Sequence, residues 1–510
     1  MNTKSKNIRV RFAPSPTGPL HMGGVRTALY NYLFAKKNRG KFILRIEDTD
    51  QKRFVDGAEK YILDSLSWCG LDPDEGPNMG GRYGPYRQSE RKHIYWDFVK
   101  QLIDSGNAYY AFDTPKDLEE MRDKMKAAGV PSPTYNSITR SNMKNSLTLP
   151  SEEVKDRIDS GEKYVVRIKM PRDKEIKLND SIRGWVSVNT NNVDDKVLFK
   201  SDGMPTYHLA NVVDDFKMQI THVIRGEEWL PSAPLHIYLY KVLGWEDDMP
   251  TFAHLPLILK PEGNGKLSKR DGDRLGFPVF PIDWYSNKEN QLFSGYREMG
   301  FLKGAFINML ALLGWNPGTE KEIFILEDLV QQFTLDRVGR SGAKYDYNKT
   351  KWFNQQHLRL IPDEDILNRA PSKFRAMLGS HDQRYKLKAI SLLKDRATFI
   401  DDIFLEGEYF FSDSFSYSEV AVKKKWHGEF ASHLQRIGEC LSNIDEFQEK
   451  NIELCFKAYV VENRVPMGKI MPMLRIATTG NMAGPSLFSI LELLGKDRVI
   501  NRINRATKSI

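Results

Sequence analysis

The chain has 510 residues, with 75 Lys and Arg against 67 Asp and Glu and a formal net charge of +8. At roughly 100 to 200 residues per domain, this length predicts about three or four domains. Hydrophobic residues make up 40% and charged residues 28% of the chain, a composition that excludes a disordered or fibrous protein. The positive excess is only weak evidence for a nucleic-acid partner, because it is spread over a large surface.

Cysteine usage and hydropathy exclude further classes. The three cysteines, Cys69, Cys440 and Cys455, form no CxxC pair, so the sequence supports neither a disulfide framework nor a cysteine-rich zinc site. No apolar run approaches the roughly 20 residues that cross a bilayer. Residues 1–6 lead directly into a strand-like segment without a signal-peptide core. We therefore expect a cytoplasmic protein without a membrane partner.

The N-terminal region has the pattern of a βαβ unit. Residues 8–13 are β-prone, residues 14–19 form a loop rich in Pro and Gly, and a helical stretch covers residues 21–37. A second β-prone run follows at residues 41–46, and residues 220–226 are predicted to be another buried strand. This order predicts a parallel sheet with ligands at the carboxyl ends of its strands.

Two later regions differ from this pattern. Residues 101–204 contain several Pro/Ser/Thr/Asn stretches, and βαβ-type segments resume only near Tyr207, which predicts a domain inserted into the sheet domain. In the last third, apolar residues recur at steps of three and four, which predicts a helical bundle. These residues are Phe430, Leu434, Ile437, Leu441 and Ile444, and then Leu487, Leu491 and Leu494.

The first candidate site is the loop before the first helix, RFAPSPTGPLHMGG at residues 11–24. Glycines at a helix N-terminus let a nucleotide approach the backbone, while free N–H groups and the helix dipole favour phosphate. His21 can donate a hydrogen bond to a phosphate oxygen. For residues 21–24 alone, an ordinary Gly-rich turn with a capping histidine is an equal alternative. The longer context favours the nucleotide site.

The second candidate is the basic loop GKLSKR at residues 265–270. A mobile basic loop suits a reaction in which negative charge develops on a phosphoryl group. By itself, a charge run of this length is more often a solvated turn. It is not a Walker loop, because no Gly stands five positions before Gly265.

The third candidate combines residues 207–215 with residues 225–229. Arg225, at a predicted strand end, offers two parallel N–H groups to a carboxylate, and Tyr207 and Asn211 can add neutral hydrogen bonds. Asp214 and Asp215 are interpreted as structural. No HExxH motif, His/Cys cluster or Ser-His-Asp order stands out, so metal-hydrolase and acyl-nucleophile interpretations lack support.

These three blocks, in this order, resemble the class I aminoacyl-tRNA synthetases and, within them, the bacterial glutamyl-tRNA synthetases. Residues 21–24 (HMGG) are similar to the family's HIGH signature, and residues 266–270 (KLSKR) are similar to its KMSKS loop. The resemblance spans nearly the whole chain. Further similar blocks lie at residues 44–50, 84–91, 207–215, 221–230, 472–475 and 484–488.

The resemblance implies ATP-dependent ligation of L-glutamate to tRNA(Glu) through a glutamyl-adenylate, with release of AMP and diphosphate. The substrate carboxylate is already ionised, so this chemistry requires alignment and charge neutralisation rather than a general base. By resemblance, His21, Lys266 and Lys269 are catalytic, and ATP with Mg²⁺ is the expected cofactor. The implied ATP-binding residues are Pro14, His21, Gly23, Gly24, Lys266, Ser268 and Lys269.

The resemblance also implies a glutamate pocket. Arg11, Tyr207 and Arg225 are expected to hold the side-chain carboxylate. Ser15 and Glu47 are expected to receive the α-amino group, and Asn211 completes the pocket. A glutamine amide would leave buried guanidinium groups without an anionic partner, which makes glutamine a poor substrate.

The implied fold class is a Rossmann-type α/β catalytic domain with an inserted α+β domain and an all-helical C-terminal region. The acyl group would pass to the 2′-hydroxyl of the terminal ribose, and bound tRNA is expected to be needed for activation. Arg475 and Leu487 are the candidates for contacting anticodon bases. The expected catalytic domain is split between residues 1–100 and 205–260, and the acceptor-stem-binding insertion covers residues 101–204. A stem-contact domain with the basic loop is expected at residues 261–355, and the anticodon-binding region at residues 356–510.

Three departures from the family pattern are visible. Residues 109–113 and 135–140 contain no Cys, where some relatives bind zinc, so no zinc is expected. Asp271 follows the basic loop where many relatives have His, which leaves the local geometry of the loop open. Residues 281–296 form a stretch that is longer than usual and has no explanation from the sequence.

Three alternatives are considered. A glutaminyl-tRNA synthetase would carry C-terminal β-barrels, and the helical periodicity after about residue 360 argues against it. A shortened paralogue that modifies a tRNA base lacks the anticodon-binding region, which the length disfavours. A tRNA-binding module without catalysis would not require His21, Lys266, Lys269 and Arg225 together. The sequence leaves open whether tRNA(Gln) is also charged, and a monomer is the expected oligomeric state.

Overall fold

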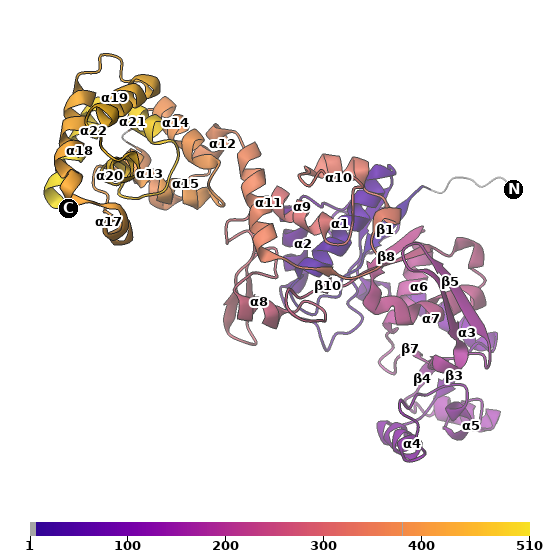
Figure 1. Ribbon diagram of the computed structural model, residues 1–510. Coiled ribbons are helices and arrows are strands. Elements are labelled where there is room, and N and C mark those ends of the chain that lie inside the picture. Colours follow the sequence, from indigo (N-terminus) through magenta and orange to yellow (C-terminus); the bar gives the residue numbers. More distant parts are fainter. Residues whose placement is uncertain (1–6, 380) are drawn as a thin grey trace. The chain divides into compact units, whose positions relative to one another are not determined.

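The computed structural model describes residues 7–379 and 381–510 and divides into two compact units (Figure 1). The first unit comprises residues 1–299 and 306–347, and the second comprises residues 300–305 and 348–510. The first six residues of the predicted catalytic domain lie outside the described part. Among the described residues, no helix combines the length and the apolar character needed to span a membrane.

A four-stranded parallel sheet forms the centre of the first unit. Its order is β2 (Lys41–Leu44), β1 (Arg9–Phe12), β8 (His222–Gly226) and β9 (Thr251–Leu255), and every neighbouring pair is parallel. The chain passes from β1 to β2 on one side, and β8 later pairs with β1 on the other side. This reversal opens a crevice at the carboxyl ends of β1 and β8, where doubly wound sheets bind ligands. The predicted parallel sheet is confirmed.

Helix α1 (Met22–Lys37) connects β1 to β2. Its N-cap is His21, and Lys36 and Lys37 in its last turn suit the negative end of the helix dipole. Val25, Leu29 and Leu33 recur at steps of four and are fully buried, so this face of the helix belongs to the core. The other long helices of the sheet domain are α2 (Ala58–Cys69), α6 (Tyr207–Lys217) and α7 (Ala233–Val242).

The inserted segment is α+β, as predicted. An antiparallel sheet of β3 (Ala108–Ala111), β4 (Val165–Ile168) and β7 (Val197–Phe199) is accompanied by α4 (Pro115–Ala127) and α5 (Ser151–Asp159). A hairpin of β5 (Glu175–Asp180) and β6 (Gly184–Asn189) follows β4 in the chain.

The predicted border at residue 100 falls inside helix α3 (Lys92–Asp104). Val99 and Leu102 of this helix share one hydrophobic core with Leu209 and Val213 of α6. Because α6 belongs to the sheet domain, this packing favours a border after α3 rather than within it.

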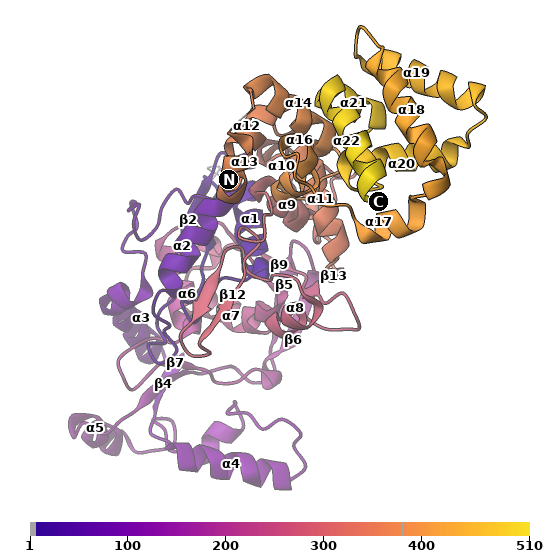
Figure 2. The same cartoon turned by 90° about the vertical axis from the view of Figure 1, so that its left-hand side faces the viewer.

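Residues 281–296, which the sequence left unexplained, contain a β-hairpin. Strands β11 (Trp284–Ser286) and β12 (Gln291–Phe293) pair antiparallel (Figure 2). This hairpin follows helix α8 (Lys269–Leu275), which begins within the basic loop. Other elements of this region are β10 (Ile258–Leu259), α9 (Lys303–Leu312), α10 (Leu326–Gln332) and β13 (Ala343–Lys344).

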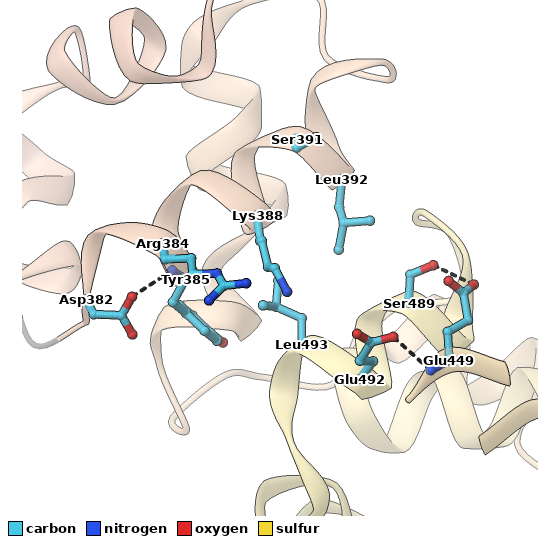
Figure 3. Close-up of a pocket in the computed structure, with 10 residues that line it drawn as sticks. All are labelled: Asp382, Arg384, Tyr385, Lys388, Ser391, Leu392, Glu449, Ser489, Glu492 and Leu493. Carbon is cyan, nitrogen blue, oxygen red and sulfur yellow. Dashed lines mark hydrogen bonds between the residues drawn. The ribbon is translucent and has the colours of Figure 1, made fainter. Parts of the chain in front are cut away.

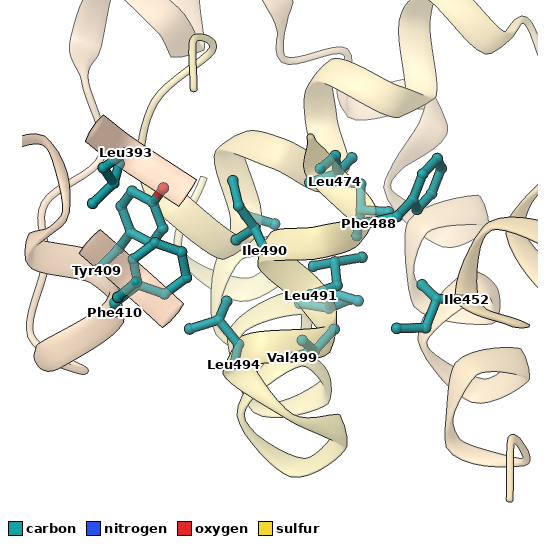
Figure 4. Packing of buried hydrophobic residues seen from close by; sticks show 14 of the residues in the cluster. Leu393, Tyr409, Phe410, Ile452, Leu474, Phe488, Ile490, Leu491, Leu494 and Val499 are labelled. Carbon is teal, nitrogen blue, oxygen red and sulfur yellow. The ribbon is translucent and has the colours of Figure 1, made fainter. Parts of the chain in front are cut away.

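The regular elements in residues 347–379 and 381–510 are helices, which confirms the predicted helical region. Leu434, Ile437 and Leu441 lie in one buried cluster with Leu487, Leu491 and Leu494, and Figure 4 shows part of it. The helices are α11 (Tyr347–Leu360), α12 (Asp363–Asn368), α13 (Ser372–Leu378), α14 (Gln383–Lys394), α15 (Ile400–Glu406), α16 (Glu408–Phe411), α17 (Glu419–Lys425), α18 (Ala431–Ser442), α19 (Glu449–Glu462), α20 (Met467–Thr479), α21 (Leu487–Leu494) and α22 (Lys496–Ser509).

Candidate active site

A cavity of about 430 Å³ lies at the carboxyl ends of β1 and β8. It collects most of the side chains that the sequence predicted for ATP and glutamate. Ser268 and Lys269 are the two predicted residues that do not line it. Those that do are Arg11, Pro14, Ser15, His21, Gly23, Gly24, Glu47, Tyr207, Asn211, Arg225 and Lys266.

His21 stands at the N-terminus of α1 with a defined ring orientation. Its Nδ1 accepts a hydrogen bond of 3.0 Å from the Gly23 N–H. Burial lowers the pKa of His21, Lys266 acts in the same direction, and the Leu267 carbonyl opposes them. A neutral ring that accepts at Nδ1 carries its hydrogen on Nε2. His21 is therefore a neutral hydrogen-bond donor at the edge of the cavity.

The backbone N–H groups at this helix end differ from the expectation. The sequence predicted that they are free to bind phosphate, and this prediction is wrong. The Met22 N–H donates to the Val279 carbonyl at 2.8 Å, the Gly24 N–H donates to the His21 carbonyl at 2.8 Å, and the Gly23 N–H is used by the His21 ring. The helix end therefore offers its dipole and the His21 side chain to a ligand. Gly23 also leaves room for the ring, because a Cβ there would lie 3.1 Å from His21 Cε1.

Arg225, near the end of β8, is 4% exposed. Its Nη1 donates to the Tyr207 hydroxyl at 2.8 Å, and its Nη2 donates to the Trp229 carbonyl at 3.3 Å. The Tyr207 and Trp229 rings pack with centroids 4.3 Å apart. Burial lowers the pKa of Arg225 and raises the pKa of Tyr207 to about 12. Among the described residues, no carboxylate is hydrogen-bonded to Arg225, and a buried guanidinium of this kind is a strong site for an anionic ligand.

Arg11 is held by a buried ion-pair network that the sequence did not predict. Asp215 Oδ1 accepts hydrogen bonds from Arg11 Nε at 3.0 Å and from Arg45 Nη1 at 2.7 Å. Burial opposes ionisation of Asp215, but Arg11 and Arg45 outweigh it and lower the pKa of this carboxyl. Asp215 therefore has the structural role expected for it. The missed signal was Arg45, two positions before Glu47 in the block at residues 44–50.

Glu47 is fixed through one of its two oxygens. Its Oε1 accepts from Arg45 Nη2 at 2.9 Å and from Asn211 Nδ2 at 3.1 Å. Burial raises the pKa of Glu47, with Arg45 and Arg11 opposing that shift. Its Oε2 has no hydrogen-bond partner among the described residues, so this oxygen is available to an ammonium group. Ser15 is exposed and lines the same cavity.

The basic loop divides its side chains between two places. The exposed Lys266 reaches the cavity, where its Nζ lies 3.0 Å from Glu228 Oε1. Ser268 instead stands at the N-cap of α8, where its N–H and its hydroxyl both donate to Asp271 Oδ2, at 3.0 and 2.6 Å. Asp271, which departs from the family pattern, therefore closes a capping box at the start of this helix.

Lys269 is held outside the cavity by the β11–β12 hairpin. Its Nζ lies 2.5 Å from Glu289 Oε2 and 3.4 Å from the centroid of the Phe293 ring. The cation therefore has both an ionic and an aromatic partner on the segment that the sequence left unexplained. Lys269 reaches a ligand in the cavity only if this pair opens.

Comparison with known proteins identifies the family. Two family models match the chain, "tRNA synthetases class I (E and Q), catalytic domain" over residues 7–352 and "Anticodon binding domain" over residues 365–507. A glutamate–tRNA ligase from Cytophaga hutchinsonii is 53% identical to the chain, over 99% of this chain and 98% of the relative. A glutamate–tRNA ligase from Amoebophilus asiaticus is 52% identical, over 99% of each chain. The chain belongs to the class I glutamate–tRNA ligases.

Solved structures agree with this assignment. A glutamate–tRNA ligase from Elizabethkingia meningosepticum, crystallised in complex with its amino acid, matches with a TM-score of 0.91 and 50% identity. A glutamate–tRNA synthetase from Elizabethkingia anophelis matches with a TM-score of 0.89 and 49% identity. Each match covers 99% of this chain and 100% of the solved chain. The predicted family is confirmed, and the glutaminyl-tRNA synthetase alternative is disfavoured.

The two residues predicted to contact anticodon bases, Arg475 and Leu487, are less exposed than that role requires. Leu487 is 2% exposed and belongs to the core cluster, so it presents no surface to a base. It opens α21 on the same apolar face as Leu491 and Leu494, and the periodicity that predicted the helix also buries this residue. Arg475 is half-buried, and its Nη2 donates to the Pro485 carbonyl at 2.8 Å. Burial also lowers the pKa of Arg475.

The second unit of this ligase contains a larger, open cavity of about 650 Å³ (Figure 3). Arg384 and Lys388 of α14 line it together with Glu449 and Glu492. Glu449 accepts a hydrogen bond from Ser489 at 2.6 Å, and Glu492 accepts one from the Glu449 N–H at 2.7 Å. None of the predicted site residues lines this cavity, so we place the chemistry in the smaller cavity of the first unit.

Among the described residues, no group of three or more His, Cys, Asp and Glu side chains is placed to hold a metal ion. The absence of zinc stays a prediction for this ligase. We expect elemental analysis of the purified protein to find less than about 0.1 zinc per chain, since a structural zinc site needs about four ligating side chains in one place. One zinc per chain, retained after dialysis against a chelator, would contradict this expectation.

Proposed function

We infer that this chain ligates L-glutamate to tRNA(Glu) in two steps, through a glutamyl-adenylate. The observation that carries the inference is the buried guanidinium of Arg225 in the same cavity as His21 and Lys266. This arrangement supports a site that binds an acidic amino acid beside a nucleoside triphosphate. The test is charging of purified tRNA(Glu) and tRNA(Gln) with radiolabelled glutamate, which also decides whether the second tRNA is a substrate. Failure to charge either tRNA would overturn the inference.

In the first step, an oxygen of the glutamate α-carboxylate attacks the α-phosphate of ATP, which enters as its Mg²⁺ complex. A carboxyl–phosphate bond forms, the bond between the α- and β-phosphates breaks, and diphosphate leaves. No proton has to be removed from the nucleophile. We assign His21 the role of donating its Nε2–H to a phosphate oxygen, while Lys266 neutralises developing charge.

Glutamate is oriented by the two ends of its pocket. Arg225 and Tyr207 bind the side-chain carboxylate, and Arg11, which is paired with Asp215, supports them from the same cavity. Glu47, through its unpartnered Oε2, and Ser15 receive the α-amino group. Asn211 keeps Glu47 in place through its hydrogen bond of 3.1 Å. These contacts hold the α-carboxylate toward the nucleotide at the N-terminus of α1.

In the second step, the glutamyl group passes from the adenylate to the 2′-hydroxyl of the terminal ribose of tRNA, and AMP leaves. We propose that the inserted domain binds the acceptor end and that residues 261–355 contact the stem. The helical region would bind the anticodon, which the match of residues 365–507 to an anticodon binding domain supports. Since Leu487 is buried, other side chains of this unit must contact the bases. A monomer is sufficient for this scheme.

Lys269 must leave the hairpin to act on the phosphates. We therefore expect Glu289→Gln to lower the KM for ATP by roughly two- to fivefold, because it removes a carboxylate that competes with ATP for this cation. The KM for glutamate should not change. The measurement is ATP–diphosphate exchange in the presence of tRNA.

A matched control for this variant is Glu262→Gln. Glu262 is another exposed glutamate, which pairs with Arg274 at 3.2 Å instead of with Lys266 or Lys269. It should leave the KM for ATP unchanged. Identical ATP kinetics in Glu289→Gln and the wild type would mean that the hairpin does not compete with ATP.

A further inference from the structure

Arg225 has a second buried partner, His254, that no site prediction included. The two residues face each other in the register of β8 and β9. Arg225 Nε lies 3.0 Å from His254 Nε2, and the His254 side chain is fully buried. Because the guanidinium Nε–H only donates, Nε2 of this ring must accept.

Asp180 determines which ring nitrogen of His254 carries the hydrogen. Its Oδ2 lies 2.6 Å from His254 Nδ1. Burial lowers the pKa of His254, and although burial opposes ionisation of Asp180, its hydrogen bonds with His254 and backbone N–H groups lower its pKa. An ionised carboxylate beside a neutral imidazole fixes the hydrogen on Nδ1 and leaves the lone pair of Nε2 directed at Arg225.

The Asp180 carboxylate cannot turn away from this contact. Its other oxygen, Oδ1, accepts three backbone N–H groups, from Ile182 and Arg183 at 2.9 Å each and from His254 at 3.2 Å. Asp180 ends β5 and is 2% exposed. The carboxylate is therefore anchored by the backbone on one oxygen and faces the ring with the other.

These contacts orient Arg225 without neutralising it. Its described acceptors are all uncharged, namely the Tyr207 hydroxyl, the Trp229 carbonyl, His254 Nε2 and His236 Nδ1 at 3.3 Å. Burial holds the pKa of His236 well below its ordinary value, so that ring is neutral as well. Arg11 differs, because the Asp215 carboxylate is hydrogen-bonded directly to it. The His254 ring stands between the guanidinium of Arg225 and the Asp180 carboxylate, so Asp180 reaches Arg225 only through the imidazole.

We propose that Asp180 and His254 are positioning residues for glutamate specificity. Asp180 sets the tautomer of His254, and the neutral imidazole directs the guanidinium of Arg225 at the side-chain carboxylate of the substrate while leaving its charge for that carboxylate. The proposal rests on the proposed function, since it requires that Arg225 binds the substrate.

The test is Asp180→Asn, which keeps the shape of the side chain. The amide oxygen must remain at the Oδ1 position, because three N–H donors converge there. The amide NH₂ then faces His254 Nδ1 and shifts the ring hydrogen to Nε2, against the Arg225 Nε–H. We expect the KM for glutamate to rise by about 10- to 100-fold. The KM for ATP should stay within a few-fold, and the preference for glutamate over glutamine should fall.

Two variants of His254 separate positioning from folding. His254→Gln supplies a neutral carbonyl oxygen to Arg225 and an NH₂ to Asp180, so it should keep the KM for glutamate within about tenfold of the wild type. His254→Leu has no acceptor and should raise this KM as Asp180→Asn does. Asp195→Asn is the matched control. Asp195 is also fully buried and accepts from Tyr109 at 2.7 Å and from the Met170 N–H at 3.0 Å. Its described hydrogen bonds do not involve Arg225, so Asp195→Asn should lower the melting temperature and leave the KM for glutamate unchanged.

The outcomes distinguish this proposal from the function on which it rests. A wild-type protein that does not activate glutamate would overturn both. A wild-type protein that activates glutamate, beside a folded Asp180→Asn variant with an unchanged KM for glutamate, would overturn the positioning role alone. Equal increases in the KM for glutamate and for ATP would also overturn it, because they would indicate a general disturbance of the cavity.

Discussion

Arg225→Ala is expected to abolish glutamate activation. The variant removes the buried cation that carries the uncompensated charge of the pocket, and loss of one partner of a desolvated charge pair costs about 4 kcal/mol, on the order of 10³-fold in kcat/KM. Its affinity for tRNA should stay within a few-fold, because Arg225 is 4% exposed and lies inside the amino-acid end of the cavity. The measurement is glutamate-dependent, tRNA-stimulated ATP–diphosphate exchange, with tRNA binding measured separately.

Arg225→Lys is the informative companion to this variant. Lysine keeps the charge but cannot present two parallel N–H groups or reach His254 and Tyr207 together, so it should recover only part of the lost rate. A melting temperature near that of the wild type would show that both variants are folded. Unchanged exchange in Arg225→Ala would refute the assignment of the carboxylate pocket.

His21→Asn is expected to lower the rate of adenylate formation by roughly 10²- to 10³-fold, the usual effect of removing one donor to developing charge. The asparagine oxygen can still accept the Gly23 N–H and cap α1, but the NH₂ group of this shorter side chain does not reach the position of the His21 Nε2–H. The KM for glutamate should change by less than a few-fold. Single-turnover formation of the adenylate in the presence of tRNA measures the effect.

This variant also decides between the two interpretations of residues 21–24. If the histidine were only a helix cap, His21→Asn would react at nearly the wild-type rate, since asparagine is as good an N-cap. The matched control is His93→Ala, which changes an exposed histidine of α3 that does not line the cavity. It should have no effect on adenylate formation.

The sequence predicted the parts of the fold that depend on local patterns. The β-prone runs around β1 and β2 and the apolar steps in α18 and α21 are read within short windows, and each of these elements is present. Position 487 shows the limit of this reasoning. The three- and four-residue spacing of Leu487, Leu491 and Leu494 predicted a helix with one apolar face. That face packs in the core, so the spacing that predicts the helix also buries the leucine that was expected to contact a base.

Most of the cavity was predicted through resemblance, whereas the contacts that support it were not. Asp215 reaches Arg11 across about 200 residues of chain, and Asp180 reaches His254 from a hairpin in another part of the sequence. Such pairs depend on tertiary packing, and no local spacing encodes them. The position of Lys269 was missed for the same reason. Its partners Glu289 and Phe293 belong to a hairpin further along the chain, and only the folded structure brings that hairpin against the basic loop.

The most direct test of the central claim compares glutamate with glutamine in ATP–diphosphate exchange by the wild-type protein with tRNA(Glu) present. A pocket that leaves the charge of Arg225 to its substrate predicts a preference for glutamate on the order of 10⁴-fold in kcat/KM, because a neutral amide leaves that buried cation without a partner. Comparable exchange with both amino acids would contradict the account, since it would mean that the buried arginine does not select for negative charge.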